Sequence, residues 1–174
     1  MLKRTQRIQD TLRTLGLRWP DLAPTHEFVP VIRHADMIFV SGHAPYSDGD
    51  FRHRGRLGAE LSIEDGRRAA QLAVLGCLAS LEAELGDLGL VERILKMNGY
   101  VRCVAGFEEL PRVTDGASRM LIDMFGDAGR HARTTVGVTA LPAGVSVECE
   151  LVVVVRQDGD PGLGAAGSRP PMDW

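Results

Sequence analysis

The chain has 174 residues, 44% of them hydrophobic and 25% charged, with a formal net charge of −3 at pH 7. This length and composition are typical of one globular domain with its own core, and they exclude a largely disordered chain. The slightly acidic balance argues against a protein that holds a polyanion, because nucleic-acid binders usually present a basic face. The longest apolar run, residues 151–155, is far too short to span a membrane.

The cysteines and histidines indicate no metal site. Cys77, Cys103 and Cys149 lie far apart with no Cys-x-x-Cys pair, and the five histidines form no spaced cluster. We therefore expect free thiols in apolar surroundings rather than disulfides or zinc ligands. The charged, amphipathic N-terminus lacks the apolar core of a signal peptide, which predicts a cytoplasmic protein.

The first third of the chain predicts a helix, two strands and a loop. Residues 4–16 carry apolar side chains at helical spacing, with Gly16 as the stop signal. Residues 28–34 and 37–42 are rich in β-branched and aromatic side chains and predict two strands joined by a tight turn. The polar stretch that follows, residues 46–58, is expected to be a mobile loop.

Two further helices and three strands are expected after residue 60. Ser62 is a good N-cap for a long amphipathic helix that ends at Gly86. A strand over 91–104 and a helix over 109–125 come next. Two strands, 133–141 and 145–156, follow and are joined by Leu-Pro-Ala-Gly, which predicts a hairpin.

This order of elements predicts an α+β fold: a mixed β-sheet with two main helices packed on one face, plus an N-terminal helix. The opposite face of the sheet would then be bare, and self-association would cover it. We expect three segments: residues 1–25 as the N-terminal helix and connector, residues 26–157 as the domain, and residues 158–174 as a flexible Gly/Pro-rich tail.

The last two strands carry the residues best suited to chemistry. Strand alternation places Arg133 and Thr135 on one face of their strand, and Glu148 shares a face with Glu150 on the next. The arginine, the threonine and the glutamate are therefore expected to line one patch of the sheet. An arginine can hold a carboxylate through two parallel hydrogen bonds, and a nearby glutamate can activate a water molecule. From the pattern alone, an Arg133–Glu148 salt bridge at a sheet edge is the favoured interpretation, and a binding site is the alternative.

Four stretches, 39–45 (FVSGHAP), 55–81, 98–107 (NGYVRCVAGF) and 131–150 (HARTTVGVTALPAGVSVECE), resemble the YjgF/RidA family, most closely its longer bacterial branch with an extra N-terminal helix. The resemblance implies a chorismate-mutase-like fold, a homotrimer with ligand clefts between subunits, and no metal or organic cofactor. It also implies hydrolysis of 2-aminoacrylate and related enamines or imines to 2-oxo acids and ammonia.

The resemblance also implies roles for single residues. Arg133 matches the arginine that binds the substrate carboxylate, and Glu148 matches the glutamate that positions or activates water. Gly42 matches a glycine at which the ligand approaches the backbone, and Thr135 lies where the pocket is completed.

The chain departs from the family pattern at several of these positions. Phe28 stands where tyrosine is common, His43 replaces glutamine, and Asp115 replaces asparagine. Thr135 stands where cysteine or serine is frequent, and His131 where short members have proline. His43 could shuttle a proton or could be a histidine satisfied by hydrogen bonds.

Three functions remain open from the sequence. The first is the imine deaminase, acting on a small carboxylate substrate. The second is a diverged enzyme on the same scaffold that serves one catabolic or biosynthetic pathway. The third is a non-catalytic ligand-binding protein or an RNA-active protein. The acidic balance and the lack of a basic stripe make RNA the weaker idea. Neither nucleic acid nor a membrane is expected as a partner.

Overall fold

The computed structural model describes residues 4–22 and 27–156. The predicted tail, residues 158–174, lies outside the described residues. Three short 3-10 turns accompany the main elements, which follow the chain as α1 (Arg4–Leu15), β1 (Val31–His34), β2 (Met37–His43), β3 (Tyr46–Ser47), β4 (Asp50–Phe51), α2 (Ile63–Leu85), β5 (Val91–Arg102), α3 (Leu110–Phe125), β6 (Ala132–Val138) and β7 (Val147–Val155). No helix among the described residues is both long and apolar enough to cross a membrane.

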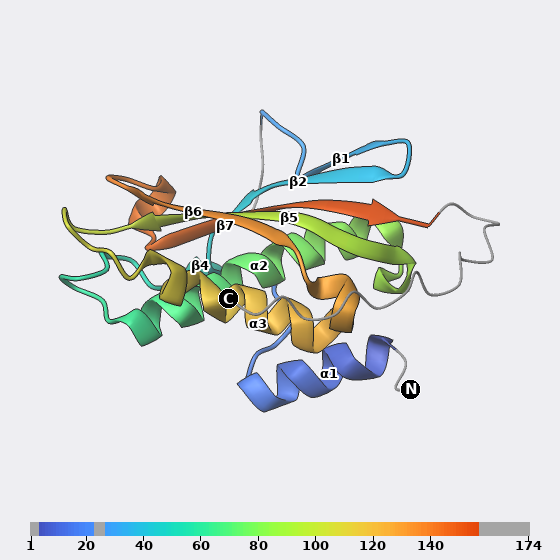
Figure 1. The fold of residues 1–174 in the computed structure, drawn as a ribbon, viewed down its shortest axis with the longest axis horizontal. Coiled ribbons are helices and arrows are strands. Elements are labelled where there is room, and N and C mark those ends of the chain that lie inside the picture. Colours follow the sequence, from blue (N-terminus) through green and yellow to red (C-terminus); the bar gives the residue numbers. More distant parts are fainter. Residues whose placement is uncertain (1–3, 23–26, 157–174) are drawn as a thin grey trace, which may run out of the picture.

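The elements form an α+β fold, as the sequence predicts. A five-stranded mixed sheet lies over α2 and α3, and α1 packs against α3 on the side away from the sheet (Figure 1). Alternate residues of β7, beginning with Val147 and ending with Val155, are buried beneath the sheet against the helices. The core thus occupies the single layer between the sheet and α2 with α3.

The ends of α2 follow from local chemistry. Ser62 accepts a hydrogen bond from the backbone N–H of Asp65, and the Asp65 carboxylate accepts one from the Ser62 backbone N–H, which makes a capping box. Gly86 ends the helix in the left-handed region, at φ 73°. The predicted start and stop of this helix are both confirmed.

Arginine side chains fasten α1 to the domain. Arg4 donates to the carbonyl oxygens of Leu88 and Gly89, and its guanidinium lies 5.3 Å from the centre of the Phe125 ring. Arg7 donates to the carbonyl of Asp123 near the end of α3. These contacts, together with the apolar side chains of α1, make the N-terminal helix part of the packed domain.

The predicted hairpin between the last two strands is wrong. The order in the sheet is β1-β2-β7-β5-β6, so β5 lies between β7 and β6. β6 runs parallel to β5, with Met97 opposite Arg133, whereas β7 runs antiparallel to β5. The connection from β5 through α3 to β6 is therefore a crossover, which parallel neighbours require.

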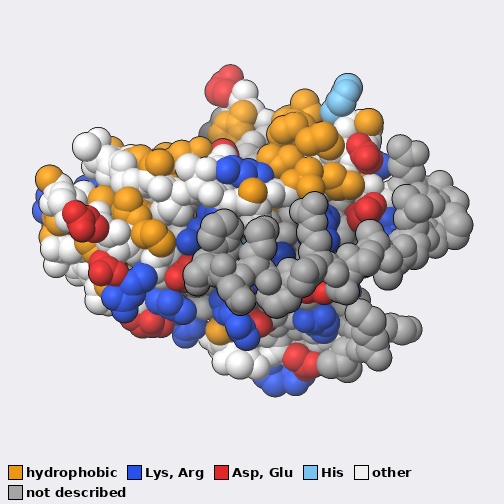
Figure 2. Space-filling view, viewed as in Figure 1, with side chains coloured by type: hydrophobic (Ala, Val, Ile, Leu, Met, Phe, Trp, Pro, Cys, Tyr) orange, Lys and Arg blue, Asp and Glu red, His pale blue; other side chains and the backbone are white. Residues whose placement is uncertain are grey.

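Among the described residues, no helix or strand covers the sheet face away from the helices, and this face is partly apolar. Ile32 and Phe39 pair across β1 and β2 and are 60% and 45% exposed, and Val136 of β6 is 40% exposed. Figure 2 shows hydrophobic side chains gathered on the surface over β1 and β2. Exposed apolar patches of this kind usually mark an interface.

The polar segment expected to be a loop contains a short hairpin instead. β3 and β4 pair with each other, with Tyr46 opposite Phe51. Asp48 and Gly49 between them have φ values of 51° and 76°, the Asp-Gly combination of a type I′ turn. The Tyr46 and Phe51 rings meet edge to face at 5.2 Å, so the hairpin carries a small aromatic contact of its own.

Candidate functional site

A cavity of about 600 Å³ opens beside the end of β2. The pairing of β2 with β7 shifts register between Val40 and His43 and resumes with His43 opposite Cys149, which is the pattern of a β-bulge. The lining combines aromatic and aliphatic walls with acidic groups and includes four of the residues singled out from the sequence. The lining residues that carry the argument below are Phe28, Gly42, His43, Tyr46, Glu148 and Glu150.

Gly42 makes room for the Glu148 carboxylate. A Cβ atom at position 42 would overlap Glu148 Oε1 and would lie 3.0 Å from its Cδ. The carboxylate therefore lies directly against the glycine backbone, and any other residue would displace it. The sequence predicts a glycine at which a ligand approaches the backbone; in the structure, the group that approaches is Glu148.

Glu148 is a half-buried carboxylate with a raised pKa. Burial raises the pKa of this group, and the negative charge of Glu150 raises it further. Glu150 itself accepts hydrogen bonds from Asn98 Nδ2 at 2.7 Å and from the Tyr100 hydroxyl at 3.1 Å. The two glutamates thus differ: Glu150 is held by neighbouring side chains, whereas Glu148 faces the cavity beside Gly42.

His43 is held in one neutral form. Its Nδ1 lies 2.7 Å from the carbonyl oxygen of Ser41, so Nδ1 carries the proton. Its Nε2 then accepts from the hydroxyl of the buried Ser80, at 2.7 Å. Burial lowers the pKa of His43. Because both ring nitrogens are hydrogen-bonded within the protein, this histidine lines the cavity and is not placed to shuttle protons.

Arg133 lies elsewhere, on β6 beneath the sheet. Its Nη1 donates to Asp115 Oδ1 at 2.8 Å and to Ser118 Oγ at 3.0 Å, both on α3. Thr135, two residues further along β6, shares a 2.8 Å hydrogen bond with the hydroxyl of Thr114. The ion pair of Arg133 is therefore with Asp115, and the alternative of an Arg133–Glu148 salt bridge is wrong for the single chain.

The free edge of Arg133 suits a carboxylate. A guanidinium has five N–H donors, and the two contacts to α3 use those of Nη1. Among the described residues, no hydrogen bond engages Nε or Nη2. That edge is a planar fork of two parallel donors, which matches the two oxygens of a carboxylate.

Arg133 and Glu148 lie on opposite faces of the sheet. Thr135 is opposite Gly99 of β5, and Glu148 is opposite Tyr100, the next residue of the same strand. Successive residues of a strand point to opposite faces, so Arg133 faces α3 and Glu148 faces the uncovered side. The shared patch expected from counting alternate residues does not exist within one chain.

The chain was compared with protein families and with proteins of known structure. Residues 10–154 match the family model described as "YjgF/chorismate_mutase-like, putative endoribonuclease". The chain belongs to this family. Protein TCP17 of Trypanosoma cruzi is 36% identical over 149 residues, which cover 84% of this chain and 93% of that protein.

Solved structures of YjgF relatives share the architecture. The protein Atu1372 of Agrobacterium tumefaciens, of unknown function, is 34% identical with a TM-score of 0.82, over 88% of this chain and 95% of that one. A protein of Shewanella oneidensis described as a "putative endoribonuclease" is 28% identical with a TM-score of 0.80, over 85% and 99%. The Escherichia coli YjgF gene product, 21% identical with a TM-score of 0.57 over 80% and 96%, shares the fold.

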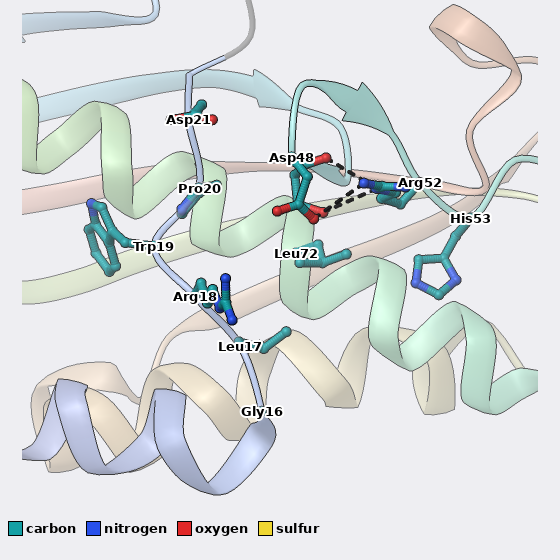
Figure 3. Close-up of a pocket in the computed structure, with 11 residues that line it drawn as sticks. Gly16, Leu17, Arg18, Trp19, Pro20, Asp21, Asp48, Arg52, His53 and Leu72 are labelled. Carbon is teal, nitrogen blue, oxygen red and sulfur yellow. Dashed lines mark hydrogen bonds and ion pairs between the residues drawn. The ribbon is translucent and has the colours of Figure 1, made fainter.

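A second hollow of about 560 Å³ lies along the connector after α1, and Asp21 lines both this hollow and the cavity beside Glu148. Figure 3 shows the connector residues on one side and Asp48, Arg52 and His53 on the other, with Leu72 of α2 between them. Asp48 and Arg52 pair with each other at 3.2 Å. None of the candidate residues from the sequence lines this hollow, and residues 4–22 and 27–156 hold no cluster of metal-ligating side chains.

Several residues around the cavity and around Arg133 could not be singled out from the sequence. Tyr46 and Phe51 line the cavity from the short hairpin, and Ser80 holds His43 from α2. Ser118 contacts Arg133 from α3. Of these residues, only Ser118 could have been predicted to lie near Arg133, because it follows Asp115 by three residues and therefore lies on the same face of the helix.

Proposed function

We propose that the protein hydrolyses 2-imino acids, and the enamines that tautomerise to them, to 2-oxo acids and ammonia. Two observations within one chain carry this proposal: a carboxylate with a raised pKa in a partly apolar cavity, and an arginine whose side-on fork makes no hydrogen bond among the described residues. Family membership supports the proposal, because these are the two residues whose roles the resemblance implies.

The cleft forms between two copies of the chain. Within one chain β5 separates β6 from β7, and Arg133 and Glu148 face opposite sides of the sheet. A second copy can present its Arg133 to the cavity of the first, and the exposed apolar sheet face supplies a surface for such association. We expect a homotrimer with three equivalent clefts, as the resemblance implies.

The reaction needs little beyond these parts. The Arg133 fork holds the substrate carboxylate and so places C2 of the imine in the cavity. Glu148 takes a proton from water as the water oxygen attacks C2 of the protonated imine, which gives a neutral carbinolamine. Glu148 then returns the proton to the nitrogen, the C–N bond breaks, and the departing ammonia takes the hydroxyl proton as the carbonyl forms. The products are a 2-oxo acid and ammonium.

The raised pKa of Glu148 suits both of its roles, as the base when water attacks and as the acid when ammonia leaves. A carboxylate of raised pKa is a stronger base toward water, and in its protonated form it is still acidic enough to donate to an amine. His43 is left out because its two ring nitrogens are already engaged.

Kinetics of ammonia release test the proposal. A pyridoxal-dependent dehydratase acting on serine supplies 2-aminoacrylate in place, and the protein should accelerate ammonia release above the spontaneous rate. Arg133→Ala should abolish the acceleration while the oligomer persists. Arg119→Ala is the matched control, because Arg119 is an exposed arginine of α3 that pairs with Asp123 outside the site. The absence of acceleration with every small imino acid tried would overturn the proposal.

RNA cleavage, which the family description mentions, is the less favoured function. The cavity is lined by Asp21, Glu148 and Glu150, and among its described lining residues the only potentially cationic group is His43, whose pKa is lowered. A negatively lined cavity repels a phosphate backbone. A salt-dependent mobility shift with purified RNA, together with cleavage lost in Glu148→Gln, would reverse this preference.

A further inference from the structure

A directed chain of hydrogen bonds ends at Arg133. His131 Nδ1 lies 2.7 Å from the carbonyl oxygen of Gly129, so Nδ1 is the donor and Nε2 is left as an acceptor. Ser118 Oγ lies 3.1 Å from that Nε2 and therefore donates its only hydrogen to it. The lone pairs of Ser118 Oγ then face Arg133 Nη1, which donates at 3.0 Å. With a neutral His131, each link in this chain allows one direction only.

The chain depends on a neutral His131. Burial lowers the pKa of its imidazole, and the charge of Arg133 lowers it further. A protonated His131 would carry a hydrogen on Nε2, and Ser118 would lose its acceptor. The environment of the ring therefore favours the protonation state that the hydrogen bonds require.

Two acceptors one helical turn apart orient the guanidinium. Asp115 Oδ1 and Ser118 Oγ take the hydrogens of Nη1, and both belong to the face of α3 that packs over β6. A single acceptor would let the planar group rotate about its contact, whereas two acceptors on one nitrogen fix its plane. The fork formed by Nε and Nη2 is then the edge that remains for a ligand.

We propose that Ser118 and His131 are positioning residues that hold Arg133 with its Nε–Nη2 edge toward the substrate carboxylate. The proposal rests on the proposed function, in which Arg133 binds that carboxylate. Neither residue touches the ligand; Ser118 acts on Arg133, and His131 acts through Ser118. The substrate class that follows is a planar carboxylate bound side-on by two parallel hydrogen bonds.

Paired substitutions separate this role from simple packing. His131→Gln keeps an acceptor near the place of Nε2, whereas His131→Asn keeps only a donor near the place of Nδ1. Ser118→Thr keeps the hydroxyl, and Ser118→Ala removes it. We expect Ser118→Ala and His131→Asn to raise KM, and the Kd for the product analogue pyruvate, about tenfold, with kcat within about twofold. His131→Gln and Ser118→Thr should stay near wild type.

Each result supports or overturns the proposal. Equal effects of the Asn and Gln substitutions, or a fall in kcat at unchanged KM, would contradict the positioning role. Wild-type-like binding by Ser118→Ala, with binding lost in Arg133→Ala, would overturn this inference and leave the proposed function intact. Wild-type protein that neither binds pyruvate nor hydrolyses imines would instead overturn the proposed function itself. Circular dichroism and oligomer size on each variant identify any that fail to fold.

Discussion

Gly42→Ala tests whether the close approach of Glu148 to the β2 backbone matters for catalysis. The added methyl group would overlap Glu148 Oε1 and lie 3.0 Å from Cδ. Carbon atoms in contact prefer about 3.5–4.0 Å, so the carboxylate must move by about 1 Å. A displacement of that size at a reacting group costs about 100-fold in rate.

The measurement is kcat/KM for ammonia release in a double-mutant cycle. Glu148→Ala removes the colliding side chain, so Gly42→Ala should cause no further loss in that background. In the wild-type background Gly42→Ala should lower kcat about 100-fold and leave the thermal midpoint and the oligomer nearly unchanged. Full activity of Gly42→Ala, or equal losses in both backgrounds, would refute the reasoning.

Three further predictions concern charge, pH and stability. Asp115→Asn keeps an acceptor for Arg133 but removes a negative charge near the bound carboxylate, so KM should fall by about fivefold. Solvent limits the size of this effect, because the Asp115 side chain is 51% exposed. In a pH–rate profile, kcat/KM should fall as pH drops through the raised pKa of Glu148, because the water needs the deprotonated carboxylate as its base. Glu150→Gln removes the neighbouring negative charge and should move this acidic limb of the profile to lower pH. Ser62→Ala should lower the free energy of unfolding in urea by about 1 kcal/mol without changing activity.

The helices could be predicted from the sequence because their ends depend on local chemistry. Ser62 and Asp65 form the capping box from residues three apart, and Gly86 and Gly126 end α2 and α3 at positive φ. The strands could be located for the same reason, since alternation within a strand is visible in the sequence. Strand β5 departs from strict alternation: a register shift between Ile94 and Lys96 accompanies the 36% exposure of Leu95.

The pairing of the strands could not be predicted, because the side-chain pattern of a strand does not identify which strand lies beside it in the sheet. The Leu-Pro-Ala-Gly connection favours a hairpin locally, yet β5 lies between β6 and β7. Counting alternate residues on two strands says nothing of their relative register, and a shift of one residue exchanges the faces. That is why Arg133 and Glu148 were expected on one patch and lie on opposite faces.

The candidate site residues fall into two groups, and strand pairing and helix packing decide which residues meet. Phe28, Gly42, His43 and Glu148 meet at one cavity because β2 pairs with β7. Arg133, Thr135 and Asp115 meet because α3 packs over β6. Residue types identified the members of each group, but only the packing shows that the groups lie apart within one chain. In the proposed function a second copy brings them together.

Complementation between two nearly inactive variants tests most directly whether the catalytic cleft is shared between copies. Arg133→Ala and Glu148→Ala chains, co-expressed with different affinity tags and purified on both, give mixed oligomers. In a mixed trimer one cleft of three joins an intact Glu148 to an intact Arg133, so activity should return to about one third of the wild-type level. Mixed oligomers as inactive as either variant alone would contradict a catalytic cleft shared between copies.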